Sequence, residues 1–324
     1  MISRWRRLLA KVHFVSGKGG VGKSFVAAGL AVKLANRNEG PVLLIDIQGV
    51  GRALKLLGLN TTPFQNTGLP ETESVYGARI LPRETFRQYF SQVLALGNEN
   101  SSLAQLTLGL REKITDILLE NRIVSAFVDA CPGLEPATLL GKIHFEATEG
   151  CAPESETRWA HVVVDAPSTG HFLMLFKSTF AMMDVFQAGT VLKQAKSIRE
   201  FALNSDNCLI HIVSNAEELP LQEAWEILKN LNLLGMKVSQ FVINRIPPMD
   251  PSTFKIGAIK NPQTDWQREI LLQEEIWKEQ NRLIEEFISR FEQKPRISKI
   301  KETFHAASFE GVVEMEKQLS DCLS

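Results

Sequence analysis

The feature that most constrains this chain is a glycine-rich loop between a predicted strand and a predicted helix. A β-branched run at 12–16 leads into GKGGVGKS at 17–24, and a helical pattern follows as far as Asn36. This is the pattern GxxxxGK[ST] in its required setting, in which backbone N–H groups turn inward around phosphate oxygens. The start of the helix adds a partial positive charge. The loop predicts nucleotide binding, with Lys23 at the β- and γ-phosphates and Ser24 as a Mg²⁺ ligand.

Strand-like and helix-like segments alternate along the chain. Short β-branched runs are separated by helical patterns, an order typical of α/β proteins with a doubly wound, mostly parallel sheet. Such sheets bind their ligands at the carboxyl ends of the strands. We therefore expect the fold of a P-loop nucleotide-binding protein. The predicted strands are 12–16, 42–46, 161–165, 208–213 and 238–243.

Two helical stripes interrupt or follow this alternation. Apolar residues recur three and four apart at 103–117, which is typical of an amphipathic helix. A second stripe runs from Trp266 to Phe291 and predicts a long helix that Pro295 ends. The predicted divisions are a P-loop core at 1–60 and 157–262, a mainly helical insertion at 61–156, and C-terminal helices packed on the core at 263–324.

Composition excludes several classes of function. With 36 Lys and Arg against 37 Asp and Glu, the net charge is −1, so the chain has no global positive field for coating nucleic acid or an anionic membrane. Its 4 cysteines form no CxxC pair and are too sparse for a disulfide framework, which favours a reducing compartment. We find no signal peptide and no apolar run of membrane-spanning length. We expect a cytoplasmic protein, with peripheral membrane contact left open and no nucleic-acid partner.

Lys18 has no role in the plain loop motif, yet it directly follows the first glycine. The loop resembles that of the deviant Walker A ATPases, which reads GKGGVGK[ST]. In that family the extra lysine crosses a dimer interface and touches the partner's phosphates, much as an arginine finger does. The resemblance implies ATP or ADP held between two copies, in a homodimer or a paralogous heterodimer. The alternative is a solvated lysine beside the loop.

A later segment narrows the resemblance to one branch. VVVDAPSTGH at 162–171 is similar to the strand and switch D-x-A-P-T-G-H of the arsenite-pump and guided-entry ATPases, the latter targeting tail-anchored proteins. The resemblance implies that Asp165 holds a magnesium-bound water. It covers roughly residues 12 to 250. The single phosphate loop in this chain corresponds to a bacterial-type member with one half.

The segment VINRIPP at 242–248 resembles the adenine-binding segment of this branch. There an asparagine amide offers a donor and an acceptor to the base edge. From the residues alone, the alternative is a turn whose conformation is determined by asparagine and proline. The nucleotide contacts that the family resemblance implies are Gly17, Gly19, Gly20, Val21, Gly22, Lys23, Ser24, Phe25, Asn244 and Arg245.

The chain also departs from the family. Relatives carry a water-activating aspartate where this sequence has Gln48, and a neutral amide can orient water but cannot accept its proton. We therefore expect slow or partner-dependent turnover, with Asp46 supporting magnesium or the switch. No CxxC pair is present for the structural zinc of eukaryotic guided-entry dimers, so zinc is not expected. The cysteines do not resemble the converging trio of the arsenite pump.

Three functions remain at this stage. The first is a dimeric Mg²⁺-dependent ATPase that handles a hydrophobic protein client or membrane partner. The second is a nucleotide-binding scaffold with weak or no hydrolysis, and the third is a partition or division-site ATPase. A client groove could be lined by the stripe at 103–117 and by the run 172–176 with Met182 and Met183. The alternative for these apolar residues is ordinary core.

Overall fold

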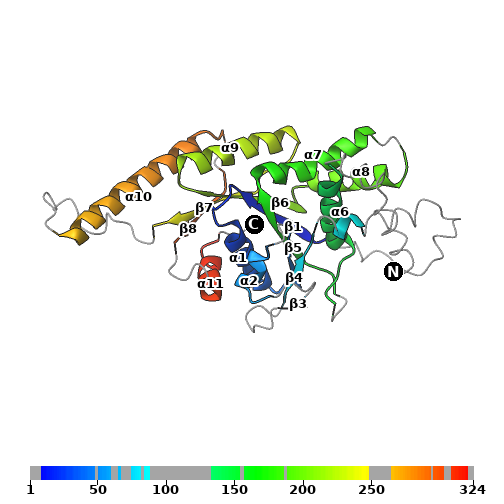
Figure 1. Cartoon of the computed structure of the whole chain (residues 1–324), viewed down its shortest axis with the longest axis horizontal. Helices are drawn as coiled ribbons and strands as arrows, with labels where there is room; N and C mark the ends of the chain where they lie inside the picture. Colours follow the sequence, from blue (N-terminus) through cyan, green and yellow to red (C-terminus); the bar gives the residue numbers. More distant parts are fainter. Residues whose placement is uncertain are drawn as a thin grey trace, which may run out of the picture.

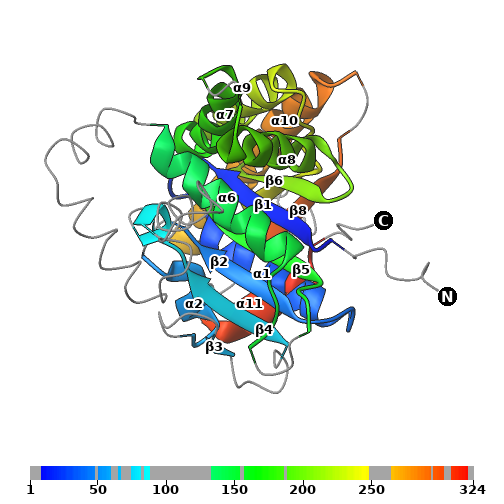
Figure 2. The ribbon, with the colours of Figure 1, turned by 90° about the vertical axis from the view of Figure 1, so that its right-hand side faces the viewer.

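The computed structural model of the chain contains a twisted sheet between two layers of helices (Figures 1 and 2). It describes residues 9–47, 50–59, 65–66, 74–81, 84–87, 133–153, 157–185, 188–247, 264–292, 295–302 and 308–319. The elements are β1 (Lys11–Gly17), α1 (Lys23–Ala35), β2 (Val42–Asp46), α2 (Arg52–Leu56), β3 (Gln65–Asn66), β4 (Val75–Arg79), α6 (Leu134–Thr148), β5 (His161–Ser168), α7 (Thr169–Val185), α8 (Thr190–Leu203), β6 (Cys208–Asn215), α9 (Glu218–Leu233), β7 (Gln240–Ile246), α10 (Asp265–Ser289), β8 (Ile297–Lys301) and α11 (Phe309–Glu316).

The strand order confirms the predicted doubly wound sheet. Among the described residues the sheet has 8 strands in the order β3-β4-β2-β5-β1-β6-β7-β8. Every neighbouring pair is parallel except β3 with β4, which is antiparallel at one edge. The chain moves outward from β1 first to one side and then to the other, as the alternation of strands and helices predicts. The strand that precedes the glycine-rich loop therefore lies in the middle of the sheet.

Alternating side chains of the strands feed two separate apolar cores. On β1, Val12 and Phe14 pack with residues of α6 to α10, whereas Val15 packs with residues of α1, α2 and α11. Figure 2 shows these two groups of helices on opposite sides of the sheet. Because both faces are covered, the central strands are buried on both sides and mainly apolar, as expected of a parallel sheet. This rigid centre fixes the position of the loop that follows β1.

Among the described residues, the structure adds three strands that the sequence did not predict, β3, β4 and β8. Strand β4 lies within 61–156 and pairs in parallel with β2, so this part of the expected helical insertion belongs to the sheet. Strand β8 lies within the expected C-terminal helices and extends the other side of the sheet beside β7. The stripe at 103–117 lies outside the described residues, and the division into domains stays a prediction.

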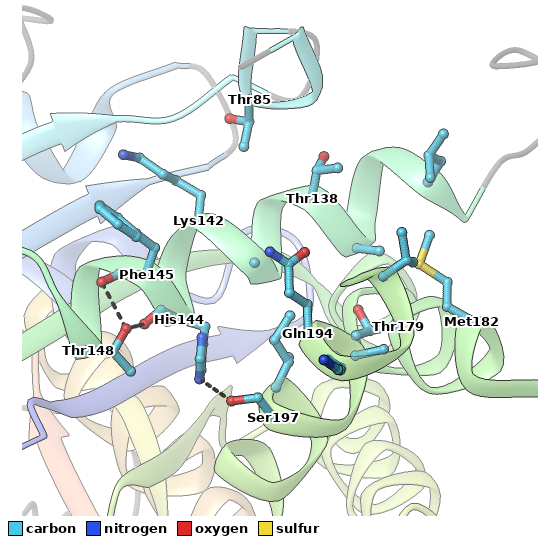
Figure 3. Close-up of a pocket in the computed structure, with 17 residues that line it drawn as sticks. Thr85, Thr138, Lys142, His144, Phe145, Thr148, Thr179, Met182, Gln194 and Ser197 are labelled. Carbon is cyan, nitrogen blue, oxygen red and sulfur yellow. Dashed lines mark hydrogen bonds between the residues drawn. The ribbon is translucent and has the colours of Figure 1, made fainter. Parts of the chain in front are cut away.

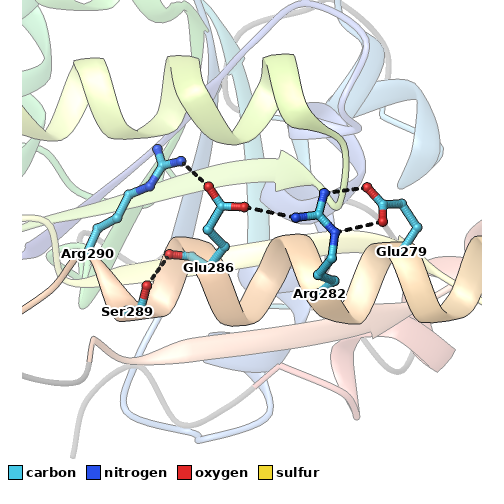
Figure 4. A network of polar contacts seen from close by, with 5 residues as sticks. All are labelled: Glu279, Arg282, Glu286, Ser289 and Arg290. Atoms are coloured by element: carbon cyan, nitrogen blue, oxygen red, sulfur yellow. Dashed lines mark hydrogen bonds and ion pairs between the residues drawn. The ribbon is translucent and has the colours of Figure 1, made fainter.

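Helix α10 starts and ends close to the predicted limits. Thr264 and Gln267 form a capping box at its start, and Ile284 and Phe287 near its end are buried. Trp266 is 60% exposed, so the apolar stripe is buried only towards the end of the helix. The solvent side carries a row of ion pairs among Glu279, Arg282, Glu286 and Arg290, which Figure 4 shows. Exposed pairs of this kind add little stability each.

A row of buried polar side chains crosses the sheet on its α1 face. His13 of β1 contacts His211 of β6 at 3.1 Å and His161 of β5 at 3.2 Å. His161 also contacts Glu39 at 3.0 Å, and His211 contacts Gln240 of β7 at 3.2 Å. Burial lowers the pKa of each histidine, to about 4 for His211. The three imidazoles are therefore neutral at pH 7.

This row predicts a loss of stability in acid. An unfolded histidine takes up a proton near pH 6.5, but the buried ones resist protonation, so the free energy of unfolding falls as the pH drops below that value. Between about pH 6.5 and pH 5, His211 alone should contribute a decrease of roughly 1 to 2 kcal/mol. Urea unfolding at several pH values measures it. The variant His211→Leu should be less stable at pH 8 yet lose less stability in acid, and an equal acid loss in both proteins would contradict the assignment.

Candidate functional site

The glycine-rich loop lies at the carboxyl end of β1, as predicted. Gly20 and Gly22 have positive φ angles of 90° and 93°, which glycine adopts without strain. A Cβ atom on Gly17 would overlap the carbonyl oxygen of Val213, because β6 passes directly beside the loop. Helix α1 starts at Lys23 without an acidic residue in its first turn. Its first N–H groups thus face a concave loop suited to an anion.

Lys23 is placed to exchange a loop contact for a phosphate contact. Its ammonium group donates a hydrogen bond to the carbonyl oxygen of Lys18 at 3.0 Å, and the residue is only 8% exposed. Burial lowers the pKa of Lys23, while the nearby Asp165 carboxylate partly restores it. An ammonium that is held over the loop in this way can swing to a phosphate oxygen with little rearrangement.

Two carboxylates meet beside the loop. Asp46 ends β2, Asp165 lies on β5, and the two residues are register partners. The pKa of Asp165 is raised to about 7, mainly by burial and further by the negative charge of Asp46, although a hydrogen bond from the Ser24 hydroxyl lowers it. Within the described residues, Oδ1 of Asp165 is buried and has no hydrogen-bond partner. A buried, unpartnered carboxylate oxygen next to a hydroxyl is a donor set that fits Mg²⁺.

The fit to magnesium requires few protein ligands. Among the described residues, no group of three or more His, Cys, Asp or Glu side chains is arranged around a common metal position. Magnesium usually takes one or two protein oxygens and completes its shell with phosphate oxygens and water. Ser24 and Asp165 would thus be enough protein ligands for Mg²⁺ beside a bound nucleotide.

Two residues near the loop were not predicted as contacts. Arg52, at the start of α2, lies close enough to lower the pKa of both Lys23 and Asp165. Glu223 of α9 forms an ion pair with Lys18 at 3.0 Å between Nζ and Oε1. The sequence does not indicate either contact, because each residue reaches the loop from a separate element.

The remaining predicted residues have different positions. Phe25 is half-buried on α1, and Asn244 ends the regular part of β7 with its amide directed to the loop. Arg245 is exposed and has a φ angle of 58°, unusual for a residue other than glycine. Gln48 lies outside the described residues.

A separate cavity lies among α6, α7 and α8 and measures about 430 Å³. Figure 3 shows Thr138, Phe145, Met182 and Gln194 around it. The run 172–176 was one expected lining of a client groove. Three of its members, Phe172, Leu175 and Phe176, are instead fully buried in the core, so for these residues the core alternative is correct.

The raised pKa of Asp165 predicts that a substitution can stabilise the fold and still remove function. Asp165→Asn removes a buried charge beside Asp46 and should raise the free energy of unfolding at pH 8 by roughly 1 to 3 kcal/mol, because a carboxyl with a raised pKa destabilises the fold above pH 7. The same variant should lose any Mg²⁺-dependent activity. Urea unfolding of the wild type and the variant measures the change in the free energy of unfolding, with Asp184→Asn at an exposed position as the matched control. A less stable Asp165 variant would refute the prediction.

Comparison with protein families gives one match across most of the chain. Residues 12–282 match the CobQ/CobB/MinD/ParA nucleotide binding domain. The described part of this region contains the loop, both carboxylates and Asn244. No described helix has the length and apolar character needed to cross a membrane.

Individual relatives carry the names of ATPases. ATPase BagA of Mycobacterium tuberculosis is 29% identical over 241 residues, which are 74% of this chain and 66% of that protein. A protein of Aquifex aeolicus that carries the name of an arsenical pump-driving ATPase is 27% identical over 80% of this chain and 88% of that protein. ATPase GET3B of Arabidopsis thaliana is 24% identical over 80% of this chain and 69% of that protein. The chain thus spans just under two thirds of the length of the mycobacterial relative.

Proposed function

The chain belongs to the CobQ/CobB/MinD/ParA nucleotide-binding family, and from this premise we propose that it hydrolyses ATP with Mg²⁺ as a nucleotide-bridged dimer. It is an ATPase of the arsenite-pump and guided-entry type by its resemblance to relatives with those names. The client is a hydrophobic protein segment or a membrane partner.

One observation carries this proposal. The unpartnered Oδ1 of Asp165 lies in a buried site with the Ser24 hydroxyl and within the field of Lys23. A buried carboxylate with a pKa of about 7 is costly unless a cation uses it. A bound Mg²⁺ would neutralise charge on the β- and γ-phosphates. The chain's own groups then bind and orient the nucleotide: the loop N–H groups hold the phosphates, and Lys23 leaves the Lys18 carbonyl for a phosphate oxygen.

Lys18 connects catalysis to dimerisation. In the single chain it is paired with Glu223, and its side chain is 27% exposed. In the proposed dimer, Lys18 leaves Glu223 and reaches the phosphates of the partner, where it stabilises the charge of the transition state. Hydrolysis then needs two chains, although one chain suffices for binding.

Turnover should therefore depend on protein concentration. The specific rate of Mg²⁺-dependent ATP hydrolysis should rise as the chain dimerises, because each site needs a lysine from its partner. Lys18→Ala should lower turnover about a hundredfold or more and leave ATP affinity nearly unchanged. Lys237→Ala, an exposed lysine on the loop before β7, is the matched control. A concentration-independent rate, or full activity of Lys18→Ala, would rule out the bridging role.

Gln48 favours a second candidate, a nucleotide-binding scaffold that hydrolyses weakly or needs a paralogous partner. An amide can orient water but cannot take its proton. If Gln48 faces the attacking water, Gln48→Asp should raise the single-turnover rate of hydrolysis about tenfold or more. An unchanged or lower rate would place the water-activating group elsewhere.

The partition or division-site alternative ranks third. It would use a basic amphipathic helix at the C-terminal end, but α11 packs on α1 with Val312 and Met315 buried, and its first turn carries Glu310. The cavity among α6, α7 and α8 instead supports a client, because it is bordered by apolar side chains such as Met182 and Phe145. Flexible apolar residues adapt to varied partners.

A further inference from the structure

Asn244 makes a hydrogen bond that its expected role at the adenine base does not explain. Its amide nitrogen donates to the carbonyl oxygen of Val21, inside the phosphate loop, at 2.9 Å. Asn244 is 5% exposed and Val21 is 1% exposed, so the bond is shielded from water. The two residues are 223 positions apart in the sequence. The bond therefore ties the end of β7 directly to the loop that follows β1.

The loop is shaped to accept this amide. A Cβ atom on Gly22 would overlap the amide nitrogen of Asn244, so the space beside the last loop glycine is occupied by the asparagine. Gly22 also has a φ angle of 93°, which leaves the chain free to bend around the amide. The glycine is thus required by contact with Asn244 as well as by backbone conformation.

The backbone of β7 changes directly after Asn244. Arg245 has a φ angle of 58°, and the pairing of β7 with β8 shifts register between Ile243 and Ile246. A left-handed conformation at an arginine costs about 1 kcal/mol or more and persists only where its surroundings hold it in place. The strained residue and the shielded bond therefore occur together at the end of this strand.

The bond also fixes the orientation of the amide. An asparagine amide has a donor nitrogen and an acceptor oxygen. One of its two N–H groups donates to Val21, so the amide cannot turn over, and its oxygen and second N–H group keep fixed positions for a ligand. An acceptor at the position of the oxygen pairs with the exocyclic amino group of adenine and repels the carbonyl oxygen of guanine.

We propose that Asn244 is a positioning residue: it holds the phosphate loop through the Val21 carbonyl and, by this bond, fixes the orientation of the amide that the resemblance assigns to the adenine base. The first half concerns the nucleotide-free chain alone. The second half rests on the proposed nucleotide-binding function. Base recognition and phosphate binding are then coupled through one side chain.

The first experiment measures hydrogen–deuterium exchange of the loop amides at 17–24 in the nucleotide-free chain. Loss of one buried hydrogen bond should speed exchange about tenfold in Asn244→Ala and in Asn244→Asp, whose carboxylate cannot donate to Val21. Asn215→Ala is the matched control, because Asn215 is the register partner of Asn244 on β6 and its amide points to Glu217. Equal exchange in Asn244→Ala and the wild type would overturn the loop-holding role, and so would equal acceleration in the control.

A second variant protects the test against simple misfolding. In Gly22→Ala the new Cβ atom should push the side-chain amide of Asn244 away from Val21, although Asn244 itself is unchanged. It should speed exchange in the same amides as Asn244→Ala, with the far-ultraviolet circular dichroism of both variants unchanged. If Gly22→Ala leaves those amides as protected as in the wild type, the bond does not hold the loop.

The second experiment compares Mg²⁺-dependent binding of ATP, GTP and inorganic triphosphate by calorimetry. Asn244→Ala should weaken both ATP and inorganic triphosphate about tenfold and should abolish the preference for ATP over GTP. If the variant loses ATP affinity but binds inorganic triphosphate as tightly as the wild type does, Asn244 contacts the base only, and the coupling is overturned. A wild-type chain that binds none of the three would refute the proposed function, and the exchange experiment would still decide the loop-holding role.

Discussion

Parallel pairing around β1 is the constraint on which the rest of this structure depends. Because β1 pairs in parallel with both β5 and β6, the strands that cross the centre of the sheet all end at the same edge. That edge receives the glycine-rich loop, Asp165 and Asn244 from three distant parts of the sequence. The nearness of Gly17 to the backbone of Val213 shows how closely the loop depends on β6. A displaced β6 would alter the loop before it altered any side chain of the site.

The same pairing creates the buried histidine row at the opposite end of the strands. Its contacts can be checked by counting protons. Three neutral imidazoles carry three N–H groups, whereas the row from Glu39 to Gln240 has four contacts. The amide oxygen of Gln240 accepts from His211, His211 accepts from His13, and His13 accepts from His161, which uses all three N–H groups. The amide nitrogen of Gln240 donates to the Ser298 hydroxyl, which lies next along the row. The fourth contact, between His161 and the half-exposed Glu39, would need one further proton.

The sequence was a good guide to features that are local. The glycine-rich loop, the central strands and α10 are each marked by a motif, a β-branched run or a capping box, and the structure has them close to the expected limits. Strand β4 was missed because Gly77 and Arg79 weaken its strand signal, whereas the short β8 was missed although its five residues alternate in polarity as a strand does. Their pairing partners, β2 and β7, supply the missing stability.

The features of the site that were missed depend on tertiary register. Nothing near Glu223 in the sequence indicates that it meets Lys18, and nothing near Asn244 indicates that it meets Val21. Likewise, each of the histidines at 13, 161 and 211 has the sequence signal of an ordinary packed residue. Only the alignment of β5, β1 and β6 makes them neighbours. Motifs located the chemistry at the carboxyl edge, but contacts between strands determine how it is held.

The Lys18–Glu223 pair bears on how easily the proposed dimer could form. Both side chains are partly exposed, so the pair is screened by water and its loss costs at most about 1 kcal/mol. A nucleotide phosphate in a partly buried site is a stronger partner for an ammonium group than an exposed carboxylate is. The exchange from Glu223 to a phosphate is therefore favourable when nucleotide is present and unfavourable when it is absent. Under the proposed function, this difference makes dimer formation depend on nucleotide without any large rearrangement of the core.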